Sequence, residues 1–507
     1  MLSLGSPPRT EASQVFFPYS PISDLPHHAK QFASAAGLKL TDASNIAIPI
    51  SYWLIGFLGS FIGTPLTVFL VQSLNAQPAQ QNTIGVLLSI PWSFKLLYGF
   101  VSDVLPVGGL RRKPYFALGF ALHSACFLLL AALEKPTFSS LAVLLFVATI
   151  GQIMADVMAD TLVVERARLE DTEQRGQLQA TCYAVRFMGS VLGCLMGAVV
   201  YNQVQWGWGL SFRQVCLLTG ALPLMLLGTT LWTLYEMAAT PKTVAQQCGD
   251  IWDTICLKAV WKPMAFVYVF NFFQVPNIAW QSFLQLSLHF EPYMLGLMAT
   301  AGAVMTLLGI IAYKKFFFHV SWRHIYFTSV CVTTAFKLLQ MCLIFKWNEK
   351  YLHMSNLYFA LGDDVITQYI QGVQFLPVCI MYLRLCPDGS EGATYAMLTT
   401  FGNIALVCSA SVGTLLSKIW EVGNEALRSD DFNGLWRLTL LTSSLAPIPL
   451  LLLRLLPANQ DEQEHLITEK TRSRLGGSVF LLVLTTSLVW SISESFAVVL
   501  NAEAGSS

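Results

Sequence analysis

The stretch LAVLLFVATIGQIMADVMADTLVV, residues Leu141–Val164, is long and apolar enough to cross a bilayer as one helix. It nevertheless carries Asp156 and Asp160, which lie four residues apart and therefore one turn apart on the same helical face. An ionised carboxylate at bilayer depth costs at least ~2.5–3.5 kcal/mol on insertion scales. The two side chains must therefore face a protein interior or a water-filled path, which makes this helix a candidate functional site.

The composition of the whole chain agrees with a membrane assignment. Of its 507 residues, 54% are hydrophobic and only 12% are charged, well below the share usual in soluble domains. The net charge is zero, which gives no electrostatic reason to expect a nucleic-acid partner. The 11 cysteines show neither CxxC nor Cys/His zinc spacing, and we expect no metal and no cofactor. The sequence predicts an integral, multi-pass, all-α membrane protein.

Apolar runs of the length that spans a bilayer recur along the chain. Six precede a polar connection and six follow it, which predicts two six-helix halves. The predicted spans are Ile48–Val71, Thr83–Val101, Tyr115–Leu133, Leu141–Val164, Leu178–Tyr201 and Phe212–Tyr235, then Ala265–Leu288, Met294–Tyr313, Ile325–Phe345, Leu357–Leu383, Thr394–Leu416 and Leu435–Leu456. A further run, Val479–Leu500, is either a thirteenth span or an interfacial helix.

The predicted organisation follows from these runs. We expect a disordered cytosolic tail (1–44), a first half (45–235), a cytoplasmic connection (236–262), a second half (263–456), and a charged segment with the extra hydrophobic run (457–507). With the N-terminus in the cytoplasm, inner segments carry 17 basic residues and outer segments 7, as the positive-inside rule requires. We expect a monomer in the lipid bilayer of a plasma membrane or a plastid-type organelle, with its N-terminus cytoplasmic.

Basic residues inside the spans are few. Lys95, Arg186 and Lys337 fall in the second, fifth and ninth predicted spans. Asp363 and Asp364 form a second acidic pair in the tenth span, which is the counterpart of the fourth in a six-plus-six arrangement. This faint repeat fits two related halves with a site between them.

The loop between the second and third spans reads KLLYGFVSDVLPVGGLRRKPY, residues Lys95–Tyr115. Gly99 permits close helix approach, Asp103 can cap or pair at the membrane edge, and Arg111 and Arg112 stay on the cytoplasmic side. A glycine, an acid, a glycine turn and a basic cluster resemble the gating loop after the second span in the major facilitator superfamily. An ordinary turn that obeys the positive-inside rule is the alternative.

This form of the loop, SDxxPxxGxRRKPY after a span containing WSFK, resembles the folate–biopterin transporter family within that superfamily. The resemblance covers roughly residues 45–455 and includes DVMADTLVVERAR (Asp156–Arg168), LGDD (Leu361–Asp364), FLP (Phe375–Pro377) and LCPDGSEGATYA (Leu385–Ala396). It implies a major facilitator fold and a secondary carrier of pterins or folates that works by alternating access.

The buried charges suit such a substrate. A pterin offers two donors side by side, which a carboxylate accepts in fork geometry, and the two carboxylates of a folate tail need a cation. The candidate acceptors are Asp156, Asp160, Asp363 and Asp364, and the candidate cations are Lys95 and Arg186. Proton coupling is a second role for paired acids, because like charges a turn apart favour protonation of one. In the alternatives, the bases simply neutralise the acids, or one acid only bonds a neighbouring helix.

Amide side chains recur at helical spacing in two spans. Asn271, Gln274 and Gln281 lie on the seventh span among aromatic residues, and Gln368 and Gln371 lie on the tenth. Amides and aromatics together suit a flat heteroaromatic ligand, and we expect these residues to line the cavity. A water-lined path without specificity, with the aromatics facing lipid, explains them equally well.

Other functions find less support. The sequence contains no P-loop, GxSxG or HExxH motif, so we expect no catalytic residues and no enzyme. Glu165 and Arg166 end the fourth span and could pair between spans to close a cytoplasmic gate. A carrier of another organic anion or amino-acid-like solute, and a transporter-like receptor or channel, remain the alternative functions.

Overall fold

The computed structural model describes residues 40–504 apart from 75–83, 86, 135, 168–169, 171–175, 202–206, 237–242, 278, 291, 387–390, 417–418 and 421. The described residues form helices and turns, and no β-strand occurs among them, which confirms the all-α prediction. Most of the predicted N-terminal tail, part of the LCPDGSEGATYA motif, most of the loop after Ala167 and the side chain of Gln281 lie outside the described residues.

Nine helical segments in the described ranges are long and apolar enough to cross a membrane. They match nine of the twelve predicted spans and are built from α2 (Ala47–Phe61) with α3 (Gly63–Val68), α6 (Lys113–Ala132), α7 (Phe138–Ala167), α8 (Gln177–Val200), α10 (Phe212–Thr233), α14 (Pro292–Ala312) with η4 (Tyr313–Phe317), α15 (Trp322–Ile344), α18 (Glu391–Leu416), and α20 (Asn433–Leu445) with η5 (Ile448–Leu455). The remaining three predicted spans are also helical: η3 (Ile90–Phe94) with α5 (Lys95–Val104), α12 (Lys258–Phe273) with α13 (Ala279–Leu286), and α17 (Asn356–Arg384).

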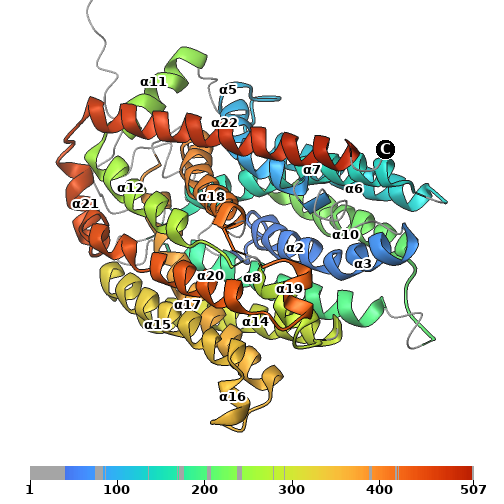
Figure 1. The fold of residues 1–507 in the computed structure, drawn as a ribbon. Helices are drawn as coiled ribbons and strands as arrows, with labels where there is room; N and C mark the ends of the chain where they lie inside the picture. Colours follow the sequence, from blue (N-terminus) through green and yellow to red (C-terminus); the bar gives the residue numbers. More distant parts are fainter. Residues whose placement is uncertain are drawn as a thin grey trace, which may run out of the picture.

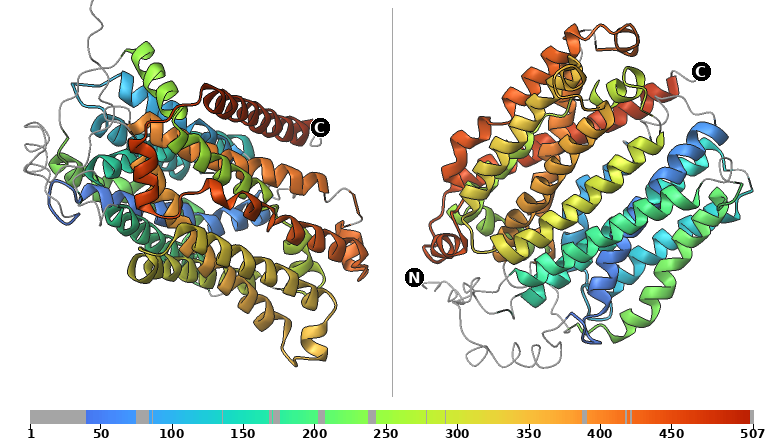
Figure 2. Two further views of the ribbon diagram at one scale, coloured as in Figure 1. Left: turned by 90° about the vertical axis from the view of Figure 1, so that its left-hand side faces the viewer. Right: turned by 90° about the horizontal axis from the view of Figure 1, so that it is seen from below.

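The helices form two groups that meet along two seams. In the right-hand view of Figure 2 the blue-to-green helices of the first half lie beside the yellow-to-red helices of the second half. One seam is formed by α5 against α18, and the other by α8 against α14. The buried core is continuous across both seams, because residues of both halves share one hydrophobic cluster. This is the two-half arrangement of a major facilitator fold.

Two of the spans are not single α-helices. In the second span, Pro91 lies in a short 3₁₀ segment, and the α-helix restarts at Lys95. The seventh span was predicted as one helix, but α12 ends at Phe273 and α13 starts at Ala279. Pro276 lies in this break, and proline supplies no backbone N–H to continue a helix. The amides predicted to form one stripe on this span therefore do not share one helical face.

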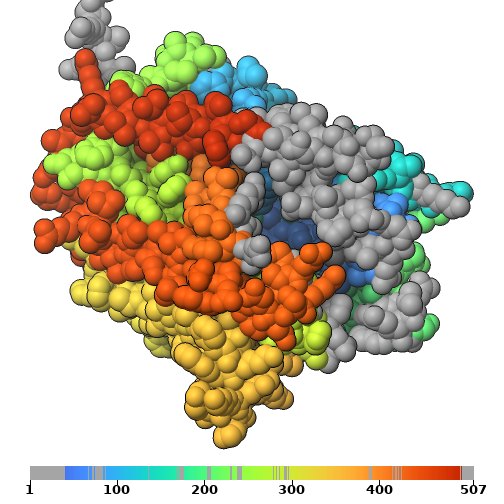
Figure 3. Space-filling model, viewed as in Figure 1, coloured from blue at the N-terminus to red at the C-terminus, as the bar shows by residue number. Residues whose placement is uncertain are grey.

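The last helix, α22 (Arg474–Ala504), lies alongside α12 and α18 (Figures 1 and 3). Phe480 stacks on Phe401 with ring centroids 4.2 Å apart, and the Tyr268 and Ser487 hydroxyls are 2.8 Å apart. The exposed side of α22 carries Leu475, Val479, Leu482 and Val489 together with Thr485 and Thr486. The described apolar part of this helix, Arg474–Trp490, is shorter than the nine candidate spans, so the thirteenth span and the interfacial helix both stay predictions.

Glycines let α8 approach α2 closely. A Cβ atom placed on Gly193 would lie 2.4 Å from the carbonyl oxygen of Phe57, and Gly189 and Gly197 meet α2 backbone oxygens at similar distances. The three glycines therefore form a packing ridge against α2.

We therefore expect Gly193→Leu to lower the melting temperature of the detergent-purified protein by about ten degrees or more, at about 2–4 °C per kcal/mol for a unit of about 150–250 residues, the size of one half. Gly228→Leu on α10 is the matched control, because a Cβ there has no atom within 4 Å in the described part of the chain. Equal melting temperatures for the two variants would contradict the close packing.

Candidate functional site

Four charged side chains from three helices of the first half meet in the middle of the fold, and we call them the central charge cluster: Lys95, Asp156, Asp160 and Arg186. The Nζ atom of Lys95 is 2.5 Å from Oδ2 of Asp156, and Nη1 of Arg186 is 2.7 Å from Oδ1. The Asp156 side chain is 1% exposed and that of Lys95 5%, whereas that of Arg186 is 17% exposed. Both oxygens of Asp156 are thus held by cations, and of the three side chains Arg186 is the most accessible.

Asp160, the second acid of the cluster, has a more distant ionic partner than Asp156. Oδ2 of Asp160 lies 3.9 Å from the Lys95 Nζ, and Oδ1 accepts a 2.5 Å hydrogen bond from the hydroxyl of Tyr52 on α2. Two acids and two bases sum to no net charge, which offsets much of the cost of burying each one. Their roles in transport stay predictions.

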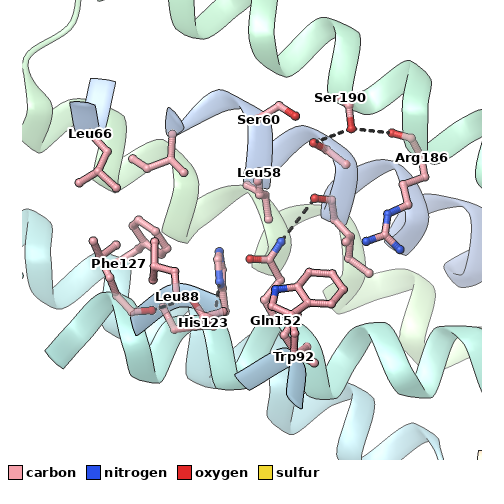
Figure 4. Close-up of a pocket in the computed structure, with 18 residues that line it drawn as sticks. Leu58, Ser60, Leu66, Leu88, Trp92, His123, Phe127, Gln152, Arg186 and Ser190 are labelled. Atoms are coloured by element: carbon pink, nitrogen blue, oxygen red, sulfur yellow. Dashed lines mark hydrogen bonds between the residues drawn. The ribbon is translucent and has the colours of Figure 1, made fainter. Parts of the chain in front are cut away.

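A cavity of about 320 Å³ adjoins the cluster within the first half. Arg186 forms part of its wall together with Trp92, His123, Gln152 and Ser190 (Figure 4). The rest of the wall is largely apolar and comes from α2, α3, α6, α7 and the start of the second span, including Leu58, Leu66, Leu88, Phe127 and Leu145. The guanidinium of Arg186 therefore links the buried acids to a space that can hold a ligand.

The predicted counterpart acids in the second half form a separate cluster. The carboxylate of Asp363 accepts a 2.8 Å hydrogen bond from Gln340, and Lys337 donates to Gln274 at 3.2 Å. Asp364 has a long contact of 3.5 Å with Gln368 on the same helix. These groups come from α15, α17 and the residue that follows α12, and among the described residues they do not form ion pairs with the first-half cluster.

The predicted cavity amides are dispersed. Asn271 donates to the backbone oxygen of Gly402 at 3.0 Å, Gln368 accepts from Thr306 at 3.2 Å, and Gln371 is exposed. None of the three lines the first-half cavity. Substrate contact by these residues stays a prediction.

A second ionic group lies at the end of the bundle that carries Arg111 and Arg112, which we call the inner end after the charge count. Nη1 of Arg112 is 2.6 Å from Asp103 and its Nε is 3.1 Å from Glu165, while Nη2 is 3.6 Å from Glu391 at the start of α18. Burial alone would lower the pKa of Arg112, but the three carboxylates outweigh it and raise that pKa above its ordinary value. Arg112 is therefore a permanent cation that joins the two halves.

Backbone contacts reinforce this inner gate, defined by Asp103, Arg112, Glu165 and Glu391. Asp103 accepts the backbone N–H of Ala393 at 2.8 Å, and a Cβ on Gly99 would lie 2.3 Å from the carbonyl oxygen of Gly392. Helix α5 thus touches the start of α18 with no space between the backbones. The inner end is closed in this structure.

The inner gate corrects one sequence-based expectation. Glu165 forms an ion pair across spans with Arg112 at 3.1 Å, whereas its 3.6 Å ion pair with Arg166 lies within one helix and does not join two spans. Arg166 instead donates to Asn45 at 3.1 Å and to the backbone oxygen of Tyr235. The bridging cation comes from the gating loop because Arg112 directly precedes α6 and faces both α5 and α7.

Sequence reasoning missed Tyr52, Trp92 and His123. His123 is the one histidine inside a predicted span, which is a usable signal for a functional or structural polar contact. Trp92 lies three residues before Lys95, and the Lys95 Nζ is 4.7 Å from the centroid of its ring. No pattern in the sequence singles out Tyr52 from the other aromatic residues of the first span.

Comparisons with known proteins agree with this architecture. The human organic anion transporter MFSD10 (TETRAN) superposes with a TM-score of 0.54 at 14% identity, covering 81% of this chain and 99% of that one. The folate-biopterin transporter of Synechocystis is 29% identical over 84% of both chains, and folate transporter 1 of Plasmodium falciparum is 25% identical over 78% of this chain and 76% of its own. The model of the BT1 family matches residues 56–473. The chain therefore belongs to the BT1 family.

Proposed function

We propose that this protein is a secondary carrier of folates and pterins that works by alternating access. The substrate class comes from the names of the relatives, and the observation that carries it in this chain is the position of Arg186. Its guanidinium binds Asp156 at 2.7 Å, and Arg186 is also one of the residues that line the cavity, so a substrate bound there can contact this side chain. An acceptor oxygen or nitrogen of the substrate can then compete with Asp156 for the same guanidinium, because each can accept its N–H groups.

The exchange of partners at Arg186 would couple binding to movement. When a substrate draws Arg186 away, Asp156 keeps only Lys95, and the contact between α7 and α8 weakens. The halves can then rock around the site while the inner gate opens. The charge count supports a cytoplasmic N-terminus, with the inner gate on the cytoplasmic side.

We further propose that transport is coupled to protons through Asp160. Asp156 has a cation on each oxygen, whereas Asp160 has a neutral donor on one oxygen and a cation only at 3.9 Å. Loss of the nearby charge of Arg186 to a substrate would change how readily Asp160 is protonated. The titratable groups that face it from the neighbouring helices are Tyr52, Lys95, Asp156, Cys182, Tyr183, Arg186, Cys379 and Tyr395.

Uptake of radiolabelled folate and biopterin into cells that lack their own carriers tests the substrate proposal. We expect uptake well above empty vector for at least one of them, and faster uptake when the trans side is preloaded with substrate, as a carrier requires. Absence of uptake for both, with the protein present at the cell surface, would overturn it. A competition panel of other organic anions and amino acids would then identify the alternative substrate.

The proton proposal has its own test. Asp160→Asn should abolish the dependence of uptake on an inward proton gradient while retaining exchange of labelled for unlabelled substrate. Asp363→Asn is the comparison variant, since Asp363 is also a buried acid within the described residues. Retained gradient dependence in Asp160→Asn, or its loss in Asp363→Asn alone, would contradict the assignment to Asp160.

A further inference from the structure

The first-half cavity has two chemically different ends. Near the central charge cluster its wall carries Trp92, Gln152 and Arg186, whereas Leu66 and Phe127 lie at the far end (Figure 4). Ligand pockets usually measure about 300–1,000 Å³, so a space of about 320 Å³ is at the small end of that range. It suits one fused ring system and leaves no room for a whole folate.

The buried acids are not free to bind the polar edge of such a ring. Both oxygens of Asp156 are occupied by Lys95 and Arg186, and breaking those bonds would leave two cations without their partner. Gln152 lies one turn before Asp156 on α7 and reaches the cavity. Its Nε2 makes only a long 3.4 Å contact with the backbone oxygen of Ile55. An amide presents a donor beside an acceptor, which is the complement of an aminopyrimidinone edge.

Other groups at this end suit a flat ring. The Lys95 Nζ lies 4.7 Å from the centroid of the Trp92 ring and helps to position that ring. Trp92 also lines the cavity, where its ring offers a stacking surface. The Nδ1 of His123 contacts the backbone oxygen of Ala148 at 3.3 Å and must donate there, because a carbonyl only accepts. Its Nε2 then keeps a lone pair and is buried without a partner among the described residues. An unsatisfied acceptor of this kind is rare unless a ligand or water satisfies it.

We infer that the first-half cavity is the subsite for the bicyclic ring of the substrate. Gln152 forms hydrogen bonds with the polar edge of the ring, and Trp92 stacks on its face. Arg186 donates a hydrogen bond to the ring from the side of the central charge cluster. The benzoyl-glutamate tail of a folate lies outside this cavity. The inference rests on the proposed function and assigns the part of the substrate that each region recognises.

Two glycines one turn apart allow a matched test of occupancy. A Cβ on Gly59 would have Gln152 Nε2 as its nearest contact at 3.8 Å, so a larger side chain there enters the cavity. A Cβ on Gly63 has no atom within 4 Å in the described structure, and Gly63 does not line the cavity. Leucine is a better helix former than glycine, so both replacements are compatible with folding.

The variants are compared with the wild-type protein in carrier-deficient cells in which the wild-type protein takes up biopterin. We expect Gly59→Leu to raise the KM for biopterin by about tenfold or more, while Gly63→Leu leaves it within about twofold. A tenfold change corresponds to ~1.4 kcal/mol, within the range for losing a buried hydrogen-bonded contact. Surface labelling and melting temperatures of both variants establish that they are folded. An unchanged KM in folded Gly59→Leu would overturn the inference.

A second pair of variants tests recognition of the ring. Gln152→Leu should weaken competition by biopterin and folate by about tenfold while competition by p-aminobenzoylglutamate, which lacks the ring, is unchanged. Thr149→Val is the control, because the Thr149 hydroxyl already bonds Leu145 O at 2.8 Å on its own helix. Equal weakening of all three competitors would overturn the ring assignment. If wild type takes up neither biopterin nor folate, the proposed function fails instead, which separates the two outcomes.

Discussion

Replacement of Asp156 by Asn is expected to reduce substrate uptake to less than a tenth of wild type per molecule at the cell surface. Asp156 is the shared anion of Lys95 and Arg186, at 2.5 and 2.7 Å. Its neutralisation leaves two buried cations facing Asp160 alone, and removal of one partner from a buried ion pair costs about 3–5 kcal/mol. The melting temperature should fall as well, so uptake must be normalised to folded, surface-exposed protein.

A double variant separates the structural effect from the transport effect. Asp156→Asn combined with Lys95→Gln restores the balance of one acid and one base, so it should recover part of the melting temperature lost in the single variant. Uptake should stay low, because the exchange of partners at Arg186 needs Asp156. Asp364→Asn, which alters a half-buried acid with one long contact to Gln368, should keep most of the activity. Near-normal uptake in folded Asp156→Asn would contradict a central role for this helix.

The membrane fold could be predicted from the sequence because span length and apolar content are local properties. Loop charges gave the predicted orientation, and the acidic positions in α7 already indicated a protein interior. The break near Pro276 was visible only as one proline, and proline inside a span can kink a helix or end it. Ends of α12 and α13 depend on tertiary contacts, such as Asn277 donating to Thr439 at 2.9 Å, which no local pattern encodes.

The pairing of charges was harder to predict than their burial. Helical periodicity places Asp156 and Asp160 on one face, but it cannot show that Asp156 takes both cations while Asp160 takes the hydroxyl of Tyr52. The apparent repeat between the fourth and tenth spans suggested a shared site. In the structure Asp363 belongs to a separate group with Gln340, because side-chain contacts depend on residues that the repeat does not preserve.

The inner gate gives the second large expected effect, which is steric. A methyl group on Gly99 would lie 2.3 Å from the carbonyl oxygen of Gly392 and 3.0 Å from the backbone nitrogen of Ala393. These are backbone atoms and cannot move aside as a flexible side chain can. Gly99→Ala should therefore keep α5 away from α18 and weaken the bonds that Asp103 and Arg112 make across the seam. We expect uptake to fall by about tenfold or more, which corresponds to a loss of ~1.4 kcal/mol or more in the stability of the closed state relative to the open one.

The readout that separates an open gate from a general loss of folding is access from the inner side. Thr394 on α18 is fully buried near the gate, and its hydroxyl has no hydrogen-bond partner among the described residues, so Thr394→Cys is a mild reporter. With the exposed Cys248 and Cys331 changed to Ser, an impermeant thiol reagent should label this reporter faster in inside-out vesicles when Gly99→Ala is present. Gly85→Ala on the same predicted span is the matched control, because a Cβ there meets no described atom within 4 Å. Equal labelling rates in the Gly99→Ala and Gly85→Ala proteins would show that contact between α5 and α18 does not hold the inner gate closed.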